Sequence, residues 1–140
     1  MNSKVLMLHD NTTNDVIVVN TSYLVFAYVN EYSVTSLKMS NLSDDENAIF
    51  VKEGIGKICP QIDDNFICLH NSDDNTLCIF NIDKFIYSYY DASDKCGVVV
   101  MDIEDELYSF EVNETPHKIM KKIAEKKNGI NSSVKLGIDK

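Results

Sequence analysis

The residues most able to carry acid–base or metal chemistry are the histidines, of which the chain has three. His9 and His70 each end an apolar segment, and they are followed by Asp10 and Asn71. Repeated histidines beside such groups can form a metal or acid–base site, but no third ligand follows at helical or hairpin spacing. We therefore expect both to be structural or turn-capping residues and His117 to be exposed. No metal is expected.

The four cysteines, Cys59, Cys68, Cys78 and Cys96, include no C-x-x-C pair, which argues against a zinc knuckle or a thioredoxin-like motif. We expect all four to be reduced and mostly buried, because free cysteine behaves as a small hydrophobic residue. Whether Cys68 and Cys78 can pair stays open. A cysteine–histidine nucleophile pair also stays open, but no cysteine lies at a predicted helix N-terminus. The sequence contains neither a glycine-rich phosphate-binding loop nor the order of acidic residues found in calcium-binding loops. We therefore expect neither an enzyme nor a cofactor.

Charge is unevenly divided along the chain, whose net charge is −9. Residues 63–114 hold thirteen acidic residues and two lysines, whereas residues 115–140 hold two acidic residues and seven lysines. All cations are lysine, and the missing guanidinium fork argues against nucleic-acid or nucleotide binding. Acidic predicted turns would steer a basic partner, the alternative being a soluble acidic surface. The candidate residues of this rim are Asp73, Asp74, Asp102, Glu104, Asp105 and Glu106.

Aromatic residues gather in the segment that holds Phe85, Tyr87, Tyr89 and Tyr90. Strand alternation puts Phe85, Tyr87 and Tyr89 on one face, where they would build the core or a seam. If part of that face is exposed, tyrosines beside carboxylates make a protein-binding patch. A third interpretation is a pocket in which tyrosines stack on the base of a small ligand. Tyr87, Tyr89 and Tyr90 are therefore candidate binding residues.

The chain resembles itself at an offset of 61 residues, because residues 5–62 align with residues 66–123 without a gap. Eleven aligned positions are identical, among them His9/His70, Asn20/Asn81 and Glu53/Glu114. The apolar positions also agree, as strand alternation would require of two copies of one fold. The pattern predicts a tandem duplication of a β-rich unit of about 60 residues.

Short strands separated by polar turns are predicted in the second copy, followed by a helix. Thr115 offers an N-cap, Pro116 fits the first helical position, and Asn128–Gly129 ends the helix, whose apolar face carries Ile119, Met120 and Ile123. The predicted strands are 66–70, a strand that begins over 77–80, 85–90, 98–101 and 107–112, with turns at 71–75, 92–97 and 104–106.

The first copy has the same strands, but Gly54, Gly56 and Pro60 would break a regular helix, so we expect at most one turn there. The short connector 63–65 forces the copies together, either as paired small barrels or as one continuous pseudo-twofold sheet. The expected fold is mostly β (α+β): two tandem five-stranded SH3-like units packed as a pseudo-twofold pair, with one C-terminal amphipathic helix. The expected division is a first β repeat at 1–62, a second with the helix at 63–128, and a flexible tail at 129–140.

The order of segments in the second copy resembles the small flagellar FlbD family. The resemblance is carried by Phe66 to His70, Ile79-Phe80-Asn81, Phe85-Ile86, Val98 to Met101, Phe110 to Thr115 and Ile119 to Ile123. It covers each copy as a pattern of strands, and both copies lack the family's Asn-Gly turn. The resemblance implies a compact five-stranded unit with a helix and, by analogy alone, a flagellar role.

From these features we expect a non-enzymatic binding protein, cytoplasmic in a bacterial host cell, that occupies a surface of another macromolecule. Its type fits an inhibitor carried by a phage or mobile element, such as an anti-CRISPR or other anti-defence protein, or the immunity partner of a toxin. The alternatives are an oligomer that sequesters a nucleotide signal and a flagellar or housekeeping accessory protein. A protein partner with a basic surface is expected, direct nucleic-acid binding and a membrane span are not, and an open sheet edge would favour a homodimer.

Overall fold

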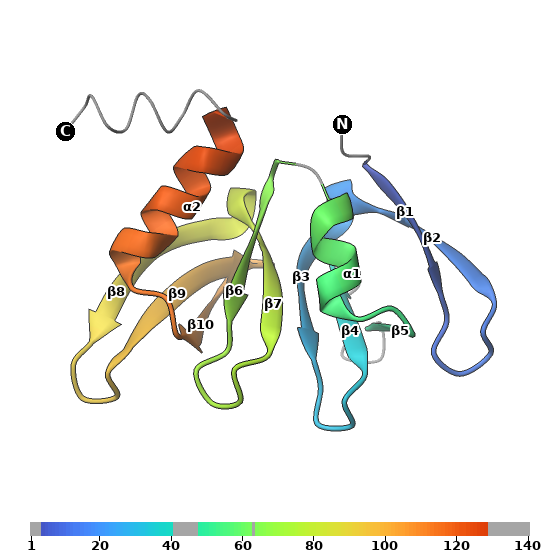
Figure 1. The fold of residues 1–140 in the computed structure, drawn as a ribbon. Coiled ribbons are helices and arrows are strands. Elements are labelled where there is room, and N and C mark those ends of the chain that lie inside the picture. The colour runs from blue at the N-terminus through green and yellow to red at the C-terminus, as the bar shows by residue number, and fades with distance from the viewer. Residues whose placement is uncertain (1–3, 41–47, 63, 129–140) are drawn as a thin grey trace.

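The computed structural model describes residues 4–40, 48–62 and 64–128, and it is mostly β with few helices (Figure 1). The expected tail at 129–140 lies outside the described residues. The first half contains β1 (Val5–His9), β2 (Val16–Asn20), β3 (Leu24–Val29), β4 (Thr35–Met39), β5 (Ile49–Val51) and α1 (Ile55–Ile58). The second half contains β6 (Phe66–His70), β7 (Leu77–Asn81), β8 (Phe85–Asp91), β9 (Cys96–Ile103), β10 (Glu106–Val112) and α2 (Pro116–Asn128).

The predicted C-terminal helix is confirmed, together with the chemistry of its start. α2 begins at Pro116, and the backbone N–H of Lys118 donates to Oγ1 of Thr115 at 3.3 Å, as an N-cap requires. In the first half, at most one turn was expected. The regular helix α1 has four residues, as expected, but a turn of 3-10 helix at Cys59–Gln61 directly follows it. The predicted strands are also present, but β9 is longer than expected because it already begins at Cys96 and continues to Ile103.

The strands form three sheets, with the orders β1-β2, β10-β9-β8 and β5-β4-β3-β7-β6. The five-stranded sheet crosses from one half to the other, because β3 pairs antiparallel with β7 through Phe26↔Phe80 and Ala27↔Ile79. None of these sheets is closed, so the expected barrel units are not confirmed. The expected pseudo-twofold pairing is wrong, because a twofold axis would set equivalent strands against each other, whereas β3 meets the counterpart of β2.

Local geometry recurs between the halves at the 61-residue offset. Asn14 and Asn75 both have positive φ, at 68° and 63°. Asn20 and Asn81 both cap a turn of 3-10 helix through their side-chain oxygens. In each half an isolated bridge links the first hairpin to the last strand, Asp10↔Val51 and Asn71↔Val112. The two halves therefore share these local features at corresponding positions.

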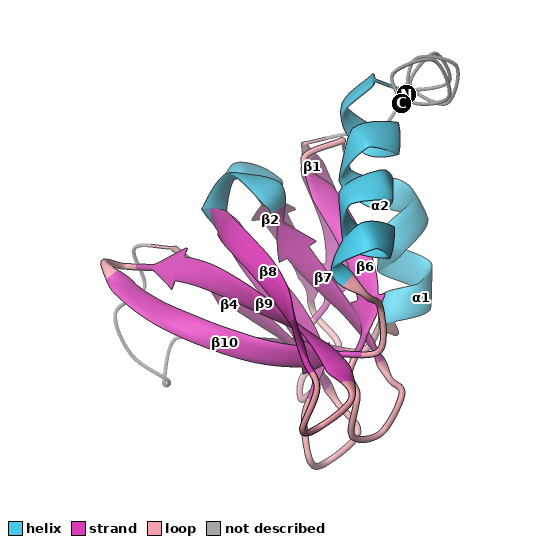
Figure 2. Ribbon diagram, turned by 90° about the vertical axis from the view of Figure 1, so that its left-hand side faces the viewer, coloured by secondary structure: helices cyan, strands magenta, loops and turns pink. Residues whose placement is uncertain are grey.

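Two main clusters of buried side chains hold the halves together, and each includes at least one buried strand residue from the other half. Ile79 of β7 belongs to the cluster built mainly from the first half, and Val25 of β3 belongs to the cluster built mainly from the second. Because both side chains cross the β3–β7 junction, the halves share their cores. Figure 2 shows both helices along one side of the strands, away from β10.

Candidate functional site

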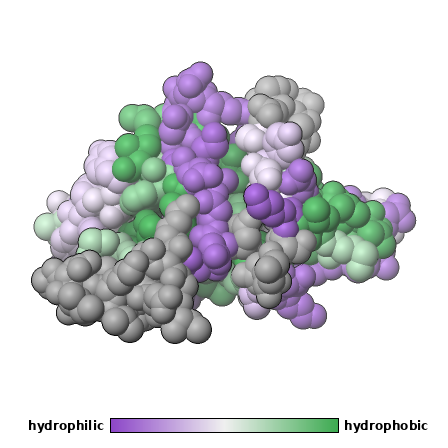
Figure 3. All heavy atoms as spheres, turned by 90° about the horizontal axis from the view of Figure 1, so that it is seen from above, coloured by the Kyte–Doolittle hydropathy of each residue, from purple (hydrophilic) through white to green (hydrophobic). Residues whose placement is uncertain are grey.

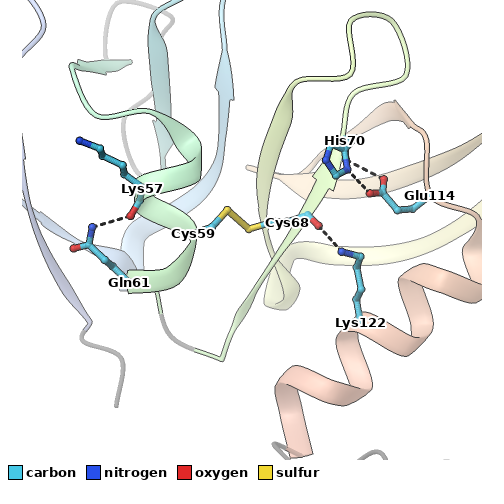
Figure 4. Close-up of a disulfide and its surroundings, with 7 residues drawn as sticks. All are labelled: Lys57, Cys59, Gln61, Cys68, His70, Glu114 and Lys122. Carbon is cyan, nitrogen blue, oxygen red and sulfur yellow. Dashed lines mark hydrogen bonds and ion pairs between the residues drawn. A yellow bond between two sulfur atoms is a disulfide. The ribbon is translucent and has the colours of Figure 1, made fainter.

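The histidines that could have carried acid–base chemistry form two matching contacts with glutamates. Nδ1 of His70 lies 2.7 Å from Oε2 of Glu114, and the backbone N–H of His70 donates to Oε1 at 2.9 Å (Figure 4). His9 and Glu53 repeat both distances. Each glutamate thus ties the end of one strand to the segment after another. This geometry agrees with a structural role, although the partner is a distant glutamate and not the adjacent Asp10 or Asn71.

The prediction that all four cysteines are reduced is wrong, because Cys59 and Cys68 form a disulfide (Figure 4). It connects the turn after α1 to β6, and on the other side of β6 the Lys122 ammonium donates to the Cys68 carbonyl at 3.2 Å. Sequence spacing did not reveal this pair, because the backbone path between the two cysteines decides whether they meet. Cys78 and Cys96 are free and buried. Burial, with the nearby charges of Asp74 and Glu114, raises the pKa of Cys78 to about 11, so it is no activated nucleophile.

Four aromatic rings meet where the two halves join. The ring of Phe26 lies 4.8 Å from Phe110, 5.3 Å from Tyr28 and 6.2 Å from Phe80, measured between centroids. Phe80 and Phe110 meet edge to face at 5.5 Å. Since these residues come from β3, β7 and β10, the cluster exists only because β3 pairs with β7.

A cleft of about 550 Å³ opens beside this cluster. Phe26, Tyr28, Phe80 and Phe110 line it, with Tyr89 of β8 on one wall. Its polar lining includes three carboxylates, contributed by Asp73, Asp91 and Glu111. We call this the acidic aromatic cleft. Its size is within the range of small-molecule or side-chain binding sites.

A second cleft of about 610 Å³ shares Phe26, Tyr28 and Phe110 with the first. It is lined further by Tyr32 and Tyr108, and it includes Lys38, whose ammonium lies 4.0 Å from Glu104. The aromatic cluster therefore separates one cleft with an acidic lining from another of mixed charge.

Carboxylates crowd together at the acidic aromatic cleft. Asp91, Asp94 and Glu111 bring oxygen atoms within 4.8 Å of one another. The hydrogen bond that the protonated Glu111 carboxyl donates to Asp94, and then the negative charges of Asp94 and Asp73, raise the pKa of Glu111. Such oxygen ligands suit hard divalent cations, and they equally suit a lysine or arginine side chain. Either positive group would relieve the repulsion.

The predicted binding residues are split between two places. Asp73 and Tyr89 line the acidic aromatic cleft, and Tyr87 stacks on Tyr89 at 5.9 Å between ring centroids. Asp74 lies in the same β6–β7 turn, where hydrogen bonds from Thr76 lower its pKa. Tyr90 is 52% exposed and does not line the cleft.

The remaining predicted acids lie at the β9–β10 turn. Asp102 accepts a hydrogen bond from the backbone N–H of Asp105, and Glu104 and Asp105 both have positive φ. Glu106 accepts from the Tyr108 hydroxyl at 3.2 Å. This turn and the β8–β9 turn lie at opposite ends of β9, whose eight residues span about 23 Å. The structure therefore does not unite the predicted acidic residues in one rim.

The aromatic face predicted for β8 is also corrected. A register shift falls between Phe85 and Tyr87, because Phe85 pairs with Met101 and Tyr87 with Val100. Neighbouring residues of β9 point to opposite faces, so the shift turns Phe85 away from Tyr87. Phe85 consequently packs against the second core, and Tyr87 and Tyr89 are left on the exposed face.

Sequence reasoning did not select Asp91, Asp94, Phe80, Phe110 or Glu111 as site residues. Alternation along 106–112 gave no signal for the pair, because it sets Phe110 and Glu111 on opposite faces of one strand, whereas both residues line the cleft. No pattern in the sequence near these residues indicates that their strand, β10, lies next to β3 and β7.

Comparisons of the chain with protein-family models, curated proteins and solved structures find no significant match. The resemblance to the FlbD family therefore rests on the strand pattern alone. Among the described residues, no helix has the length and apolar character needed to cross a membrane. The class that fold and cleft define is a small, mostly β protein with an acidic aromatic cleft at the junction of its halves.

Proposed function

We propose that this chain is a non-enzymatic binding protein whose acidic aromatic cleft takes a basic side chain from a protein partner. The main support for this proposal is the lining of that cleft, where four aromatic rings lie beside Asp73, Asp91 and Glu111. An arginine or lysine side chain fits both the aromatic rings and the carboxylates of the cleft. Its cation is attracted to ring faces and forms charge-assisted hydrogen bonds with carboxylates.

The charge around the cleft supports a cationic ligand over a nucleotide. No lysine lines the acidic aromatic cleft within the described part of the chain. The carboxylates would repel a phosphate, whereas a basic partner would also be steered by the net charge of −9. A nucleotide-sequestering role is therefore the weaker alternative, and a flagellar accessory role has the strand pattern as its sole support.

The proposed biological role is inhibition by occupation of a basic surface on the partner. It follows from the type of chain, which is small and acidic and contains a binding cleft. An anti-defence protein of a phage or mobile element, or a toxin-immunity protein, acts in this way without chemistry of its own. The proposed location is the cytoplasm of a bacterial host cell.

We also infer that the fold arose by tandem duplication of one β unit. Three features support this inference: the gapless sequence alignment, the 61-residue spacing between the starts of β1 to β4 and those of β6 to β9, and the repeated His–Glu contacts at 2.7 Å. The division into repeats at 1–62 and 63–128 follows from it. In this view, duplication created the binding site, because the cleft takes residues from both copies.

The test compares the two acidic groups in one binding experiment. A fluorescein-labelled peptide that alternates arginine and tryptophan is titrated with the protein and followed by anisotropy. Replacing the cleft carboxylates, in the variant Asp73→Asn/Asp91→Asn/Glu111→Gln, is expected to weaken binding at least tenfold, because each lost carboxylate removes a partner of the cation. The effect should shrink at high salt.

The matched control is Asp102→Asn/Asp105→Asn/Glu106→Gln, which removes the same number of charges from the β9–β10 turn. It is expected to leave the affinity within about twofold, since those residues lie outside the cleft. An equal loss of peptide affinity in both variants would show that binding depends on the net charge of the protein and not on the cleft, and it would contradict the proposal. Binding of a nucleotide panel with no peptide binding would favour the sequestering alternative.

A further inference from the structure

The junction between the halves is a strand pair stabilised by apolar side chains that cross it. Ile79 of β7 is 0% exposed inside the first-half cluster, and Val25 of β3 is 1% exposed inside the second-half cluster. A side-chain hydrogen bond completes the junction, because Nδ2 of Asn81 donates to the Leu24 carbonyl at 2.7 Å. Asn81 itself is 4% exposed.

The counterparts of these two strands are sheet edges without a second neighbour in the described part of the chain. β8 corresponds to β3 and pairs with β9 alone, while β2 corresponds to β7 and pairs with β1 alone. Their side chains stay apolar although they face solvent: Val18, the counterpart of Ile79, is 67% exposed, and Ile86, the counterpart of Val25, is 47% exposed. Such edges readily pair with another chain.

The apolar site that receives Ile79 in the first half has a counterpart in the second half, where it is an empty cleft. In the first half, Ile79 packs in one cluster with Leu24, Ala27, Ile55, Ile58 and Ile62. The residues 61 positions later line an apolar cleft of about 250 Å³ beside α2: Phe85, Ser88, Pro116, Ile119 and Ile123. This cleft has the walls of the first-half core, and the side chain that corresponds to Ile79 is not in it.

The missing side chain belongs to Val18, which lies at the far end of the molecule. Figure 1 shows β2 and β8 at opposite ends of the fold, so the two edges of one molecule do not meet each other. Figure 3 shows the apolar surface at the β1–β2 end. Its exposed residues are Val5 at 50%, Met7 at 65%, Val16 at 57% and Val18 at 67%.

We propose that the β8 edge of one molecule binds the β2 edge of a second copy of this chain, repeating the internal β3–β7 junction. The register carries over from Phe26↔Phe80 and Ala27↔Ile79, which gives Tyr87↔Val19 and Ser88↔Val18 between molecules. Val18 enters the cleft beside α2, Ile86 covers the β1–β2 end, and the exposed Asn20 donates to the Phe85 carbonyl. The interface is head-to-tail, so it builds a ring or an open chain of molecules. It is independent of the proposed peptide-binding function.

Sedimentation velocity of the full chain over a concentration series is the first test. The wild type is expected to show a mass that rises with concentration above the 15.9 kDa monomer. Val18→Lys and Ile86→Lys should each stay monomeric. The first variant loses the β2 edge and the second loses the β8 edge, so in either solution the intact edge meets no intact edge of the other kind. The control Leu107→Lys removes an apolar residue that is 70% exposed on β10, outside both edges, and should associate like the wild type.

Mixing the two edge variants makes the test specific for a head-to-tail interface. The intact β8 edge of Val18→Lys should bind the intact β2 edge of Ile86→Lys and give a 1:1 dimer that grows no further. Circular dichroism first verifies that each variant is folded. If a lysine variant fails to fold, Val18→Ser and Ile86→Ser replace it, since they remove the apolar groups without adding charge.

A third measurement reads the register directly. Val18→Cys mixed with Ser88→Cys should form an intermolecular disulfide under mild oxidation, whereas Val18→Cys mixed with Tyr90→Cys, which is two residues out of register, should react much less. The proposal is overturned by a wild type that is monomeric at every concentration. It is equally overturned by an edge variant that associates on its own, or by a mixture that stays monomeric while the wild type associates.

Discussion

Oε2 of Glu114 lies 2.7 Å from Nδ1 of His70, and the same carboxylate also accepts the backbone N–H of His70 at 2.9 Å. The glutamate is 7% exposed and stands between the last strand and α2, so it holds the end of β6 against the start of the helix. In each half, one glutamate contacts both the imidazole ring and the backbone N–H of a histidine. This pair of contacts joins the end of the first strand of that half to the segment after its last strand.

Removing this contact is expected to destabilise the protein. Glu114→Ala leaves the backbone N–H of His70 without its acceptor, and an unsatisfied buried group costs about 1–3 kcal/mol. Urea unfolding measures the change. Glu53→Ala makes the same change in the first half, where the side chain is 19% exposed against 9% for Glu114, so its loss should be smaller. An equal or greater loss at Glu53 would contradict the burial argument.

Gly97 has a packing requirement that its counterpart in the first half does not share. A Cβ built on Gly97 would lie 2.0 Å from the backbone oxygen of Glu114, so Gly97→Ala must displace either β9 or the segment before α2. We expect a loss of about 3 kcal/mol in unfolding free energy. Gly56→Ala is the control, because nothing lies within 4 Å of its Cβ and alanine favours the helical turn. A tolerated Gly97→Ala would contradict the observed packing.

The Cys59–Cys68 disulfide should be visible as a difference in thiol number and stability. Under non-reducing conditions, denatured protein should have two reactive thiols, from Cys78 and Cys96, and four after reduction. Closing a nine-residue separation predicts that Cys59→Ser/Cys68→Ser costs about 2–3 kcal/mol in the oxidised protein. Under reducing conditions, the variant and the wild type should have similar stability. Four thiols without a reductant would contradict the pairing.

The crowded carboxylates predict an unusual response to pH. The pKa of Glu111 is raised above 4.5 by Asp94 and its neighbours, so the folded state binds this proton more readily than the unfolded state. Its stabilising contribution is therefore present below pH 4.5 and is lost as the pH rises through the folded pKa.

Thermal unfolding across pH checks this sign. Glu111→Gln should melt at a higher temperature than the wild type at pH 7, because it removes the repulsion, and the difference should disappear as the pH falls below 4.5. Glu125→Gln, an exposed position on α2, controls for the loss of one negative charge and should show no such pH dependence. A Glu111→Gln variant that melts lower than the wild type at pH 7 would contradict the proposed repulsion.

The sequence by itself determined the local elements. Alternation placed the strands, Thr115 and Pro116 fixed the start of α2, and Gly54, Gly56 and Pro60 limited α1 to one turn. The gapless offset of 61 residues also matched corresponding strands before their positions in space were known. These features depend on interactions within a few residues, so a linear pattern is sufficient to predict them.

Only the tertiary structure decided how these elements meet. The pattern of β3 does not say whether its edge faces β7 or β8, because both strands offer the same backbone groups. That choice brings Phe26 against Phe110 and joins Cys59 to Cys68. Within the second half, the bridge Asn71↔Val112 sets Asp73 near Glu111 and apart from the β9–β10 turn. The candidate site and the disulfide depend on contacts between distant residues, and packing of the whole chain selects those contacts.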